Sequence, residues 1–433
     1  MTGPAAASGP RAPGGNLLSR LRRRLRPGDR DSAPAGAPAP RRGGRGRLYT
    51  LVIPTYDRPD LLDRLLSYLA QRGADFPILV LDSSPEPAAA RNAARCGTGP
   101  LPVTRIAYPA ETDPYAKVAD GLRAVATPFM SFCADDDLLL LSALDPCLDV
   151  LEARREVVGV HGSYLNFSDG PAGFQLEYVV YRGPSVAGAD ALARLQAQFA
   201  AYEAVYYAVM RTEAARRAFM RTADMETTLG KELLSAALTV AQGEVVRLPM
   251  LFYARSTGQS YSYSNWHPHQ ILAREPALLF REYGRFRGIL GDGIVGTTGW
   301  QGRREDLDTA LDMVFLKYMG SFLDSRVLDL IARDRAAGMD GEAVVSDIWT
   351  TFVSHASRTS HPETPLFPEG GTGFGPDRYR AGEAIHDYVH DGESIAGPRR
   401  TKLLFECVFP TLAPPAVLDA AALRHFIEEV SVY

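Results

Sequence analysis

Three aspartates in a row, Asp135, Asp136 and Asp137, are the residues of this sequence with the clearest capacity for chemistry. They follow an apolar run that begins at Phe129, and such a run is typical of a strand buried on both faces of a parallel sheet. Adjacent like charges repel one another, and a hard divalent cation, bound by carboxylates and substrate phosphates, would offset that repulsion. The alternative is a solvated acidic turn before a helix that we expect near Ser142.

The elements around the aspartates are read from apolar periodicity and from proline and glycine positions. Strands are expected over 49–54, 77–81, 103–108, 157–161 and 245–249. Helices are expected over 115–125, 144–152, 230–241, 272–286 and 307–331, with further helices from 59 and over 88–95. The short alternation of strand and helix before the aspartates predicts βαβ units and a parallel sheet. Its strands then end at one edge, where ligands bind in open α/β sheets.

Length and composition narrow the class of protein. With 433 residues the chain is too long for one ordinary core, so we expect two domains or one domain with extensions. A net charge of -4 argues against a nucleic-acid binder, and no apolar run approaches the length of a membrane span. The four cysteines show no metal spacing and there is no secretory signal, so we expect a cytoplasmic protein.

Residues 1–47 are rich in Pro, Ala, Gly and Arg, a composition that predicts a disordered basic tail. Within it, the leucines of the segment Leu17 to Arg26 fall on one helical face, with arginines around the rest. This pattern fits a short basic helix on an anionic membrane, which would make the protein membrane-associated. It also fits a solubilising arginine tail, since so short a helix is unstable alone.

Two common nucleotide motifs are missing from the sequence. The loop after the first strand is Thr55-Tyr56-Asp57-Arg58 and lacks G-x-G-x-x-G, and no G-x-x-x-x-G-K-[ST] occurs in the chain. Both absences weaken the dinucleotide-oxidoreductase and P-loop interpretations of a doubly wound sheet. Polar groups still follow three of the expected strands: the loop 55–58, Asp82 and the three aspartates. Such a row of polar groups suits a ligand that carries both a base and phosphates.

The ordered motifs VIPTYDRPDLLDRLL, ILVLDSS and TPFMSFCADDD, with a lysine-bearing helix before the last, resemble a family 2 glycosyltransferase. The resemblance covers about residues 48–262, and it is closest to a bacterial subgroup whose aspartate motif reads CADDD. It implies an α/β GT-A nucleotide-sugar-binding fold, a doubly wound mixed sheet, over 48–265. We expect residues 266–433 to form a mostly helical C-terminal extension with an acceptor or oligomer role.

The resemblance also implies which residues bind the donor. It places Thr55, Tyr56 and Asp82 around the base, with Arg58 in the same loop and Lys117 near base or phosphate. In its aspartate motif Asp135 faces the ribose, Asp136 binds Mn²⁺ or Mg²⁺, and Asp137 is a second ligand or supports the first. Common members read D-x-D-D, and Ala134 stands here for their first aspartate, which leaves the division of labour open.

On the acceptor side the resemblance implies a strand over 204–211 that runs under the acceptor site. It also matches Glu232 to the family's general base, although Lys231 stands where many members have a preceding acid. The alternative is that Glu232 is a first-turn glutamate that favours the helix dipole. Asp224 and Glu226 are the fallback candidates for the base.

Histidines supply weaker candidates. In many GT-A enzymes a histidine after the core completes the metal shell, and the resemblance implies that His267 or His269 could do so here. Either residue can equally be a histidine of a surface loop. His161, at the end of an expected strand, is more often structural in such a place.

The sequence therefore predicts a metal-dependent inverting glycosyltransferase that moves a sugar from a nucleoside-diphosphate sugar, with a UDP-sugar favoured, to an acceptor hydroxyl. Two alternatives stay open. Ala134 and Lys231 also fit a nucleotide-sugar-binding subunit that has lost catalysis. A nucleotidyltransferase uses a similar sheet, but it would usually carry a glycine-rich basic loop after the first strand.

Overall fold

A computed structural model describes the following parts of the chain: residues 45–170, 173–180, 183–200, 202–256, 267–298, 300–320, 323, 325–348 and 364–365. The predicted basic segment Leu17 to Arg26 lies outside the described residues. No described helix has the length and apolar character needed to cross a membrane.

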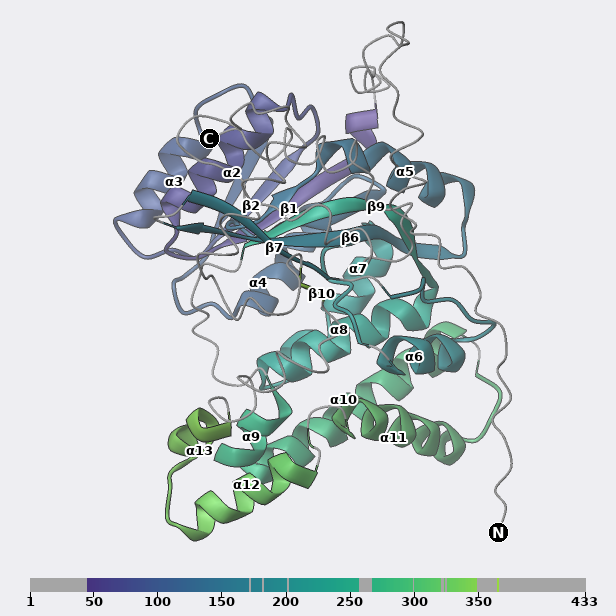
Figure 1. Ribbon diagram of the computed structural model, residues 1–433. Coiled ribbons are helices and arrows are strands. Elements are labelled where there is room, and N and C mark those ends of the chain that lie inside the picture. The colour runs from purple at the N-terminus through teal and green to yellow at the C-terminus, as the bar shows by residue number, and fades with distance from the viewer. Residues whose placement is uncertain are drawn as a thin grey trace, which may run out of the picture. The chain divides into compact units, whose positions relative to one another are not determined.

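One mixed sheet, seen across the upper half of Figure 1, organises the described residues. Its strands are β1 Tyr49–Thr55, β2 Ile78–Asp82, β3 Val103–Ala107, β4 Phe129–Phe132, β5 Leu138–Leu139, β6 Val157–Gly170, β7 Gly173–Val180, β8 Val209–Arg211, β9 Glu244–Ser256 and β10 Thr364–Pro365. The main path runs β10-β7-β6-β8-β4-β1-β2-β3, and β9 pairs with β5 and β6. Strands β4, β1, β2 and β3 are parallel, whereas β8 is antiparallel to both β4 and β6.

Helices surround this sheet and continue beyond it. They are α2 Pro59–Gln71, α3 Ala88–Cys96, α4 Pro114–Gly121, α5 Leu144–Ala153, α6 Ala191–Ala200, α7 Thr212–Phe219, α8 Thr228–Gln242, α9 Pro268–Arg274, α10 Pro276–Thr298, α11 Arg304–Gly320, α12 Ser325–Ala336 and α13 Gly341–Ile348. Short 3-10 turns are η1 Arg45–Leu48, η2 Leu122–Ala124, η3 Leu141–Ala143 and η4 Thr222–Asp224. The predicted fold class, an α/β doubly wound mixed sheet with a mostly helical region after it, is confirmed for the part of the chain described.

The core follows from the period-two alternation of the strands. In β1, Leu51 and Ile53 belong to a cluster that also contains the leucines of α2 and α5. Val52 points to the other face, into a cluster shared with α4, α7 and α8. That second cluster extends through Leu290 of α10 and Leu311 of α11, so the sheet and these C-terminal helices share one core. A domain boundary at residue 265 stays a prediction.

Some expected elements have other bounds in the structure. The strand expected over 204–211 is only β8, because a turn, in which Ala208 N–H donates to Val205 C=O at 3.2 Å, precedes it. The helix expected over 272–286 is two helices, since the residue before Pro276 disfavours helical backbone. The helix expected from Gly230 begins at Thr228, because the Thr227 hydroxyl accepts from Gly230 N–H at 2.9 Å and caps it.

A buried carboxylate from a distant helix fixes where α8 begins. Glu282 of α10 accepts hydrogen bonds from Glu226 N–H at 3.0 Å, from Thr227 N–H at 2.9 Å and from the Thr227 hydroxyl at 2.8 Å. A Cβ on Gly230 would lie 2.5 Å from the Glu282 Oε2 atom, so the close approach needs glycine there. A negative group at a helix N-terminus is also favoured by the helix dipole.

We expect Glu282→Ala to lower the free energy of unfolding by about 2–4 kcal/mol, because it leaves buried donors of Thr227 and Glu226 without their acceptor. Urea unfolding measures the loss. Glu226→Ala is the control: this exposed carboxylate pairs with Arg285 at the surface, and its removal should cost much less than the loss of Glu282. Equal losses in the two variants would show that Glu282 does not anchor α8.

Candidate active site

A cavity of about 240 Å³ lies at the carboxyl ends of β1 and β4. It gathers eight of the residues predicted from the sequence: Thr55, Tyr56, Arg58, Lys117, Asp135, Asp136, Asp137 and Glu232. The rest of its lining is Pro54, Pro114, Tyr115, Val118, Ala134, Ala204, Tyr206, Tyr207, Thr228 and Arg255. The cavity thus has one wall from the parallel strand ends, one from α4 and one from α8.

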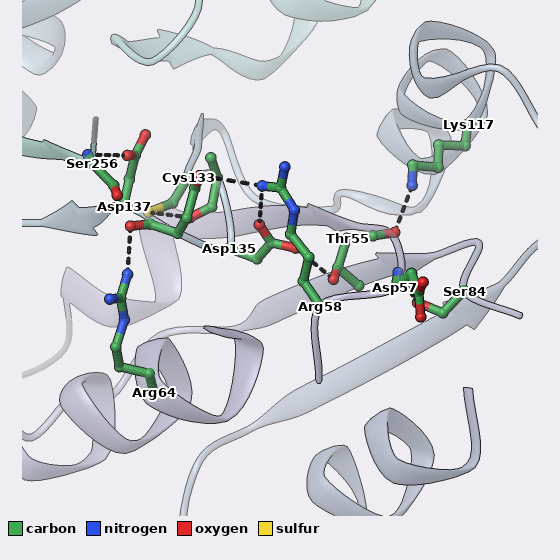
Figure 2. A network of polar contacts seen from close by, with 12 residues as sticks. Thr55, Asp57, Arg58, Arg64, Ser84, Lys117, Cys133, Asp135, Asp137 and Ser256 are labelled. Atoms are coloured by element: carbon green, nitrogen blue, oxygen red, sulfur yellow. Dashed lines mark hydrogen bonds and ion pairs between the residues drawn. The ribbon is translucent and has the colours of Figure 1, made fainter. Parts of the chain in front are cut away.

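The three aspartates are buried at the floor of this cavity, and neighbours orient each of them. The Thr55 hydroxyl donates to Asp135 Oδ2 at 2.7 Å. Arg58 Nη1 lies 3.4 Å from Asp135 Oδ1 and 3.2 Å from Asp136 Oδ2, as Figure 2 shows for the Arg58 side chain. Ser256 N–H, on β9, donates to Asp137 Oδ1 at 2.7 Å.

The cost of burying these carboxylates appears in the pKa values of Asp135 and Asp137. Burial raises the pKa of Asp135 to about 6, the Asp136 charge adds to the rise, and Thr55 and Arg58 partly oppose it. Burial and the Asp136 charge also raise the pKa of Asp137. Carboxylates that are this costly to ionise favour a bound cation, which stabilises their charged form.

The donor set fits a hard divalent cation. It consists of carboxylate oxygens, the ligands that Mg²⁺ and Mn²⁺ prefer, and Asp136 and Asp137 both line the cavity. Nowhere in the described residues do three His, Cys, Asp or Glu side chains form a metal-binding group by themselves. A cation here would take its remaining ligands from water or from phosphate oxygens of a substrate.

The loop after β1 adopts a strained backbone that brings Arg58 to the aspartates. Asp57 has a φ of 53°, in the left-handed region that aspartate tolerates better than most residues. Its N–H donates to the Ser84 hydroxyl at 2.9 Å, which ties this loop to the loop after β2. Arg58 follows this turn and faces Asp135 in Figure 2, and it also contacts Asp136.

Lys117 projects from α4 to the ends of two strands. Its Nζ donates to the Thr55 carbonyl at 2.7 Å and to the Ser83 hydroxyl at 2.8 Å, and the residue is only 2% exposed. Burial lowers the pKa of Lys117 to about 8, although the charges of Asp135 and Asp82 oppose the shift. The residue places a positive group against the cavity wall, where the sequence predicts a donor-binding lysine.

Asp82 lies behind the cavity and is not among the lining residues that the structure describes. Its Oδ1 accepts from Ser84 N–H at 2.8 Å, and its Oδ2 accepts from Asn92 at 3.1 Å and Arg105 at 2.8 Å. Burial raises the pKa of Asp82, but these hydrogen bonds outweigh burial and lower it. Since a carboxylate accepts about four hydrogen bonds, capacity for one base N–H remains, and base recognition at Asp82 stays a prediction.

Glu232 faces the cavity from α8. Because Thr227 caps the helix and Thr228 is its first residue, Glu232 lies in the second turn, and the first-turn alternative is wrong. The Tyr202 hydroxyl donates to Glu232 Oε1 at 3.0 Å. Burial raises the pKa of Glu232, while Tyr202 and the charge of Arg255 oppose the rise. A carboxylate in such a place can accept a proton near neutral pH.

The histidine candidates lie outside the described lining of the cavity. His267 and His269 flank the start of α9 with their rings parallel, 5.4 Å apart, and His267 N–H donates to Gln270 Oε1 at 3.1 Å. A metal-binding role for His267 therefore has no support in the described residues. His161 is buried, with Nδ1 2.9 Å from the Gly162 carbonyl, as expected of a structural histidine.

The fallback candidates for the base are also elsewhere. Asp224 and Glu226 pair with Arg221 and Arg285 and do not belong to the lining described for the cavity.

Sequence reasoning missed an aromatic wall. Tyr206 stacks on Phe132 with ring centroids 4.5 Å apart, and Tyr207 stacks on Tyr253 at 4.8 Å. Both tyrosines line the cavity just before β8. Because a strand was expected over these residues, the sequence analysis did not predict that the two tyrosine side chains line the cavity. Two adjacent tyrosines in a mostly apolar segment were the only feature of the sequence that could have indicated this wall.

No family model matches the sequence, and no curated protein matches it either. Among solved structures, TarS 1-349 from S. aureus, in complex with UDP-GlcNAc, is similar with a TM-score of 0.44 and 14% identity, over 63% of this chain and 73% of that one. The mannosyltransferase PcManGT from Pyrobaculum calidifontis, in complex with GDP-Man and Mn²⁺, has a TM-score of 0.37 and 14% identity, over 70% and 83%. At these values neither structure identifies a family or a substrate for this chain.

Proposed function

We propose that this chain is a metal-dependent inverting glycosyltransferase, which moves a sugar from a nucleoside-diphosphate sugar to an acceptor hydroxyl. One observation carries the proposal: a single cavity holds Asp135, Asp136 and Asp137 at the end of β4 and Glu232 on α8. The first group suits a diphosphate with its cation, and the second suits proton removal. The sequence resemblance to family 2 glycosyltransferases supports the same roles.

The donor would bind along the strand ends. Asp136 and Asp137, together with the donor phosphates, would hold Mn²⁺ or Mg²⁺, and such a cation, when bound, neutralises charge on the leaving diphosphate. Asp135, fixed by Thr55, would accept a hydrogen bond from the ribose. Arg58 supplies positive charge at the cavity wall.

Three further residues complete the proposed donor site. Lys117 adds positive charge near base or phosphate, and Tyr56, half exposed, is free to cover the base. Asp82 would orient the base from behind the cavity. A UDP-sugar remains the favoured donor.

The acceptor would approach from α8. Glu232 would take the proton from the acceptor hydroxyl as that oxygen attacks the anomeric carbon. Because the base and the leaving diphosphate lie on opposite sides of the sugar in this arrangement, attack inverts the anomeric centre. Residues 266–433 would shape the acceptor site or an oligomer contact.

A second candidate is a nucleotide-sugar-binding subunit without catalysis. The observation that favours it is Ala134, which lines the cavity at the place of an acid in the resembled family. A nucleotidyltransferase has less support, since the Thr55 to Arg58 loop has no glycine to cradle a triphosphate.

A donor-hydrolysis screen tests the proposal. The full-length protein is incubated with UDP-, GDP- and dTDP-sugars, with Mn²⁺ or with EDTA, and the released nucleoside diphosphate is measured. We expect one donor to be turned over in Mn²⁺ and not in EDTA. Binding of a donor without turnover would favour the non-catalytic subunit, and pyrophosphate release from a nucleoside triphosphate and a sugar phosphate would favour the nucleotidyltransferase.

We also propose that the basic N-terminal segment brings a cytoplasmic enzyme to anionic membranes. Arginines near such a surface contribute about 1 kcal/mol each, so binding should be weak and salt-sensitive. Co-sedimentation with phosphatidylserine liposomes at low salt should fall when residues 1–46 are deleted. If the truncated protein sediments as well as the full chain, the segment is a solubilising tail.

A further inference from the structure

Lys231 is the residue before Glu232 on α8, and its side chain contacts Asp113, the residue that precedes α4. Its Nζ lies 2.5 Å from Asp113 Oδ2. The lysine side chain is only 10% exposed, and that of Asp113 is 39% exposed. An ion pair with one member largely out of water is less screened than a surface pair, and breaking it leaves a buried ammonium without its counter-charge.

The other carboxylate oxygen of Asp113 caps the N-terminus of α4. This oxygen, Oδ1, accepts from Tyr115 N–H and Ala116 N–H, each at 3.0 Å. Helix α4 carries Lys117, which donates to the Thr55 carbonyl, and Thr55 in turn donates to Asp135. A continuous set of polar contacts therefore connects the residue beside Glu232 to the aspartates.

We propose that Lys231 is a positioning residue that fixes the distance between the base helix α8 and the donor-binding helix α4. The inference rests on the proposed function, because it assigns a purpose to the spacing between Glu232 and the donor side. The two ends of α8 have anchors of their own, Glu282 at its start and Arg194 at its last carbonyls. Lys231 adds a further restraint, which ties α8 to the residue that caps α4.

This restraint matters for rate more than for binding. A displacement of about 1 Å between a catalytic group and its substrate can cost about a hundredfold in rate. The proposed nucleotide contacts belong to the strand ends and to Lys117, whose hydrogen bonds to Thr55 and Ser83 do not involve Lys231. The acceptor proton must be removed by Glu232, which lies on the helix that would shift.

A double-mutant cycle tests the contact in full-length protein. Lys231→Met removes the charge and keeps the chain length, and Asp113→Asn breaks the ion pair while an asparagine still caps α4. With the donor found by the screen, each variant should lower kcat for transfer about ten- to a hundredfold, with donor KM within about twofold of wild type. The double variant should be no worse than the worse single variant, because both remove one interaction. Lys231→Arg should restore most of the rate.

Arg217→Met is the matched control. It removes a contact at the far end of α8, where Arg217 Nε donates to Gln242 Oε1 at 2.7 Å. Its kcat should stay at the wild-type value. If Arg217→Met lowers kcat as much as Lys231→Met does, Lys231 only stabilises the fold and does not position Glu232. If the losses of Lys231→Met and Asp113→Asn add in the double variant, the two residues do not act as a pair.

Amide hydrogen exchange separates this inference from the proposed function. In free protein, Lys231→Met should speed exchange at the first amides of α4, Tyr115 and Ala116, and Arg217→Met should not. Faster exchange together with no transfer by the wild-type protein would support the restraint and overturn the function. Unchanged exchange and unchanged kcat would overturn the restraint while the function stands.

Discussion

Asp136→Ala should lower donor turnover by roughly a thousandfold or more, since removing a group that stabilises charge on a leaving phosphate has effects of this size. Asp136 is 4% exposed, lines the cavity and lies 3.2 Å from Arg58. The fold should survive, because the substitution removes one of three carboxylates that repel one another. The unfolding midpoint of the variant should therefore be unchanged or higher.

The measurement is release of nucleoside diphosphate from the donor in Mn²⁺ and in EDTA. Asp60→Ala on α2 is the control, an exposed carboxylate that pairs with Arg91 away from the cavity. It should match the wild-type rate. Full turnover in EDTA, or in the Asp136→Ala protein, would exclude a cation at these aspartates.

Glu232→Gln should lower transfer to the acceptor by about a hundredfold to ten-thousandfold, the usual scale for loss of a positioned base. Glutamine keeps the size of the side chain and can still accept from Tyr202, but it cannot take a proton. Donor affinity should change little, because under the proposed function Glu232 would contact the acceptor and not the nucleotide. The transfer rate and the donor affinity of Glu232→Gln are measured together. A near-normal transfer rate would show that Glu232 is not the base, and equal losses of transfer rate and donor affinity would show that its role is structural.

The pH dependence of transfer gives an independent check on Glu232. The base must be deprotonated, so the rate should rise with pH through the pKa of Glu232, which burial raises. The Tyr202 hydroxyl favours the carboxylate form, and Tyr202→Phe should raise that pKa further. The acid limb of the rate profile should then shift to higher pH. If the acid limb of the pH–rate profile has the same midpoint in Tyr202→Phe as in the wild type, a group other than Glu232 controls that limb.

Local signals were sufficient to predict half of the site. The apolar run from Phe129 and the alternation of short strands and helices indicated the parallel strands, and their carboxyl ends then place Thr55 next to the aspartates. The side of the cavity formed by β1 and β4 therefore follows from patterns within a few residues of each other.

The other half depends on contacts between residues far apart in the chain. Asp113 and Lys231 pair across 118 positions, and nothing local to either residue indicates its partner. Glu282 contacts the start of α8 from α10, whose beginning at Pro276 the sequence analysis missed because it expected one helix over 272–286. Tyr206 faces the cavity because a turn over 205–208 delays the start of the expected strand. In each case tertiary contacts decide what the local sequence leaves open.

Binding of a nucleoside diphosphate tests the account most directly, because it does not require the acceptor to be known. UDP and GDP are titrated into the full-length protein by calorimetry, in Mn²⁺ and in EDTA. The account predicts that one diphosphate binds in Mn²⁺, at least about tenfold more weakly in EDTA and in Asp136→Ala, and normally in Glu232→Gln. Equal affinity in Mn²⁺ and EDTA, or no binding of any nucleoside diphosphate, would contradict a cation-dependent donor site at the three aspartates.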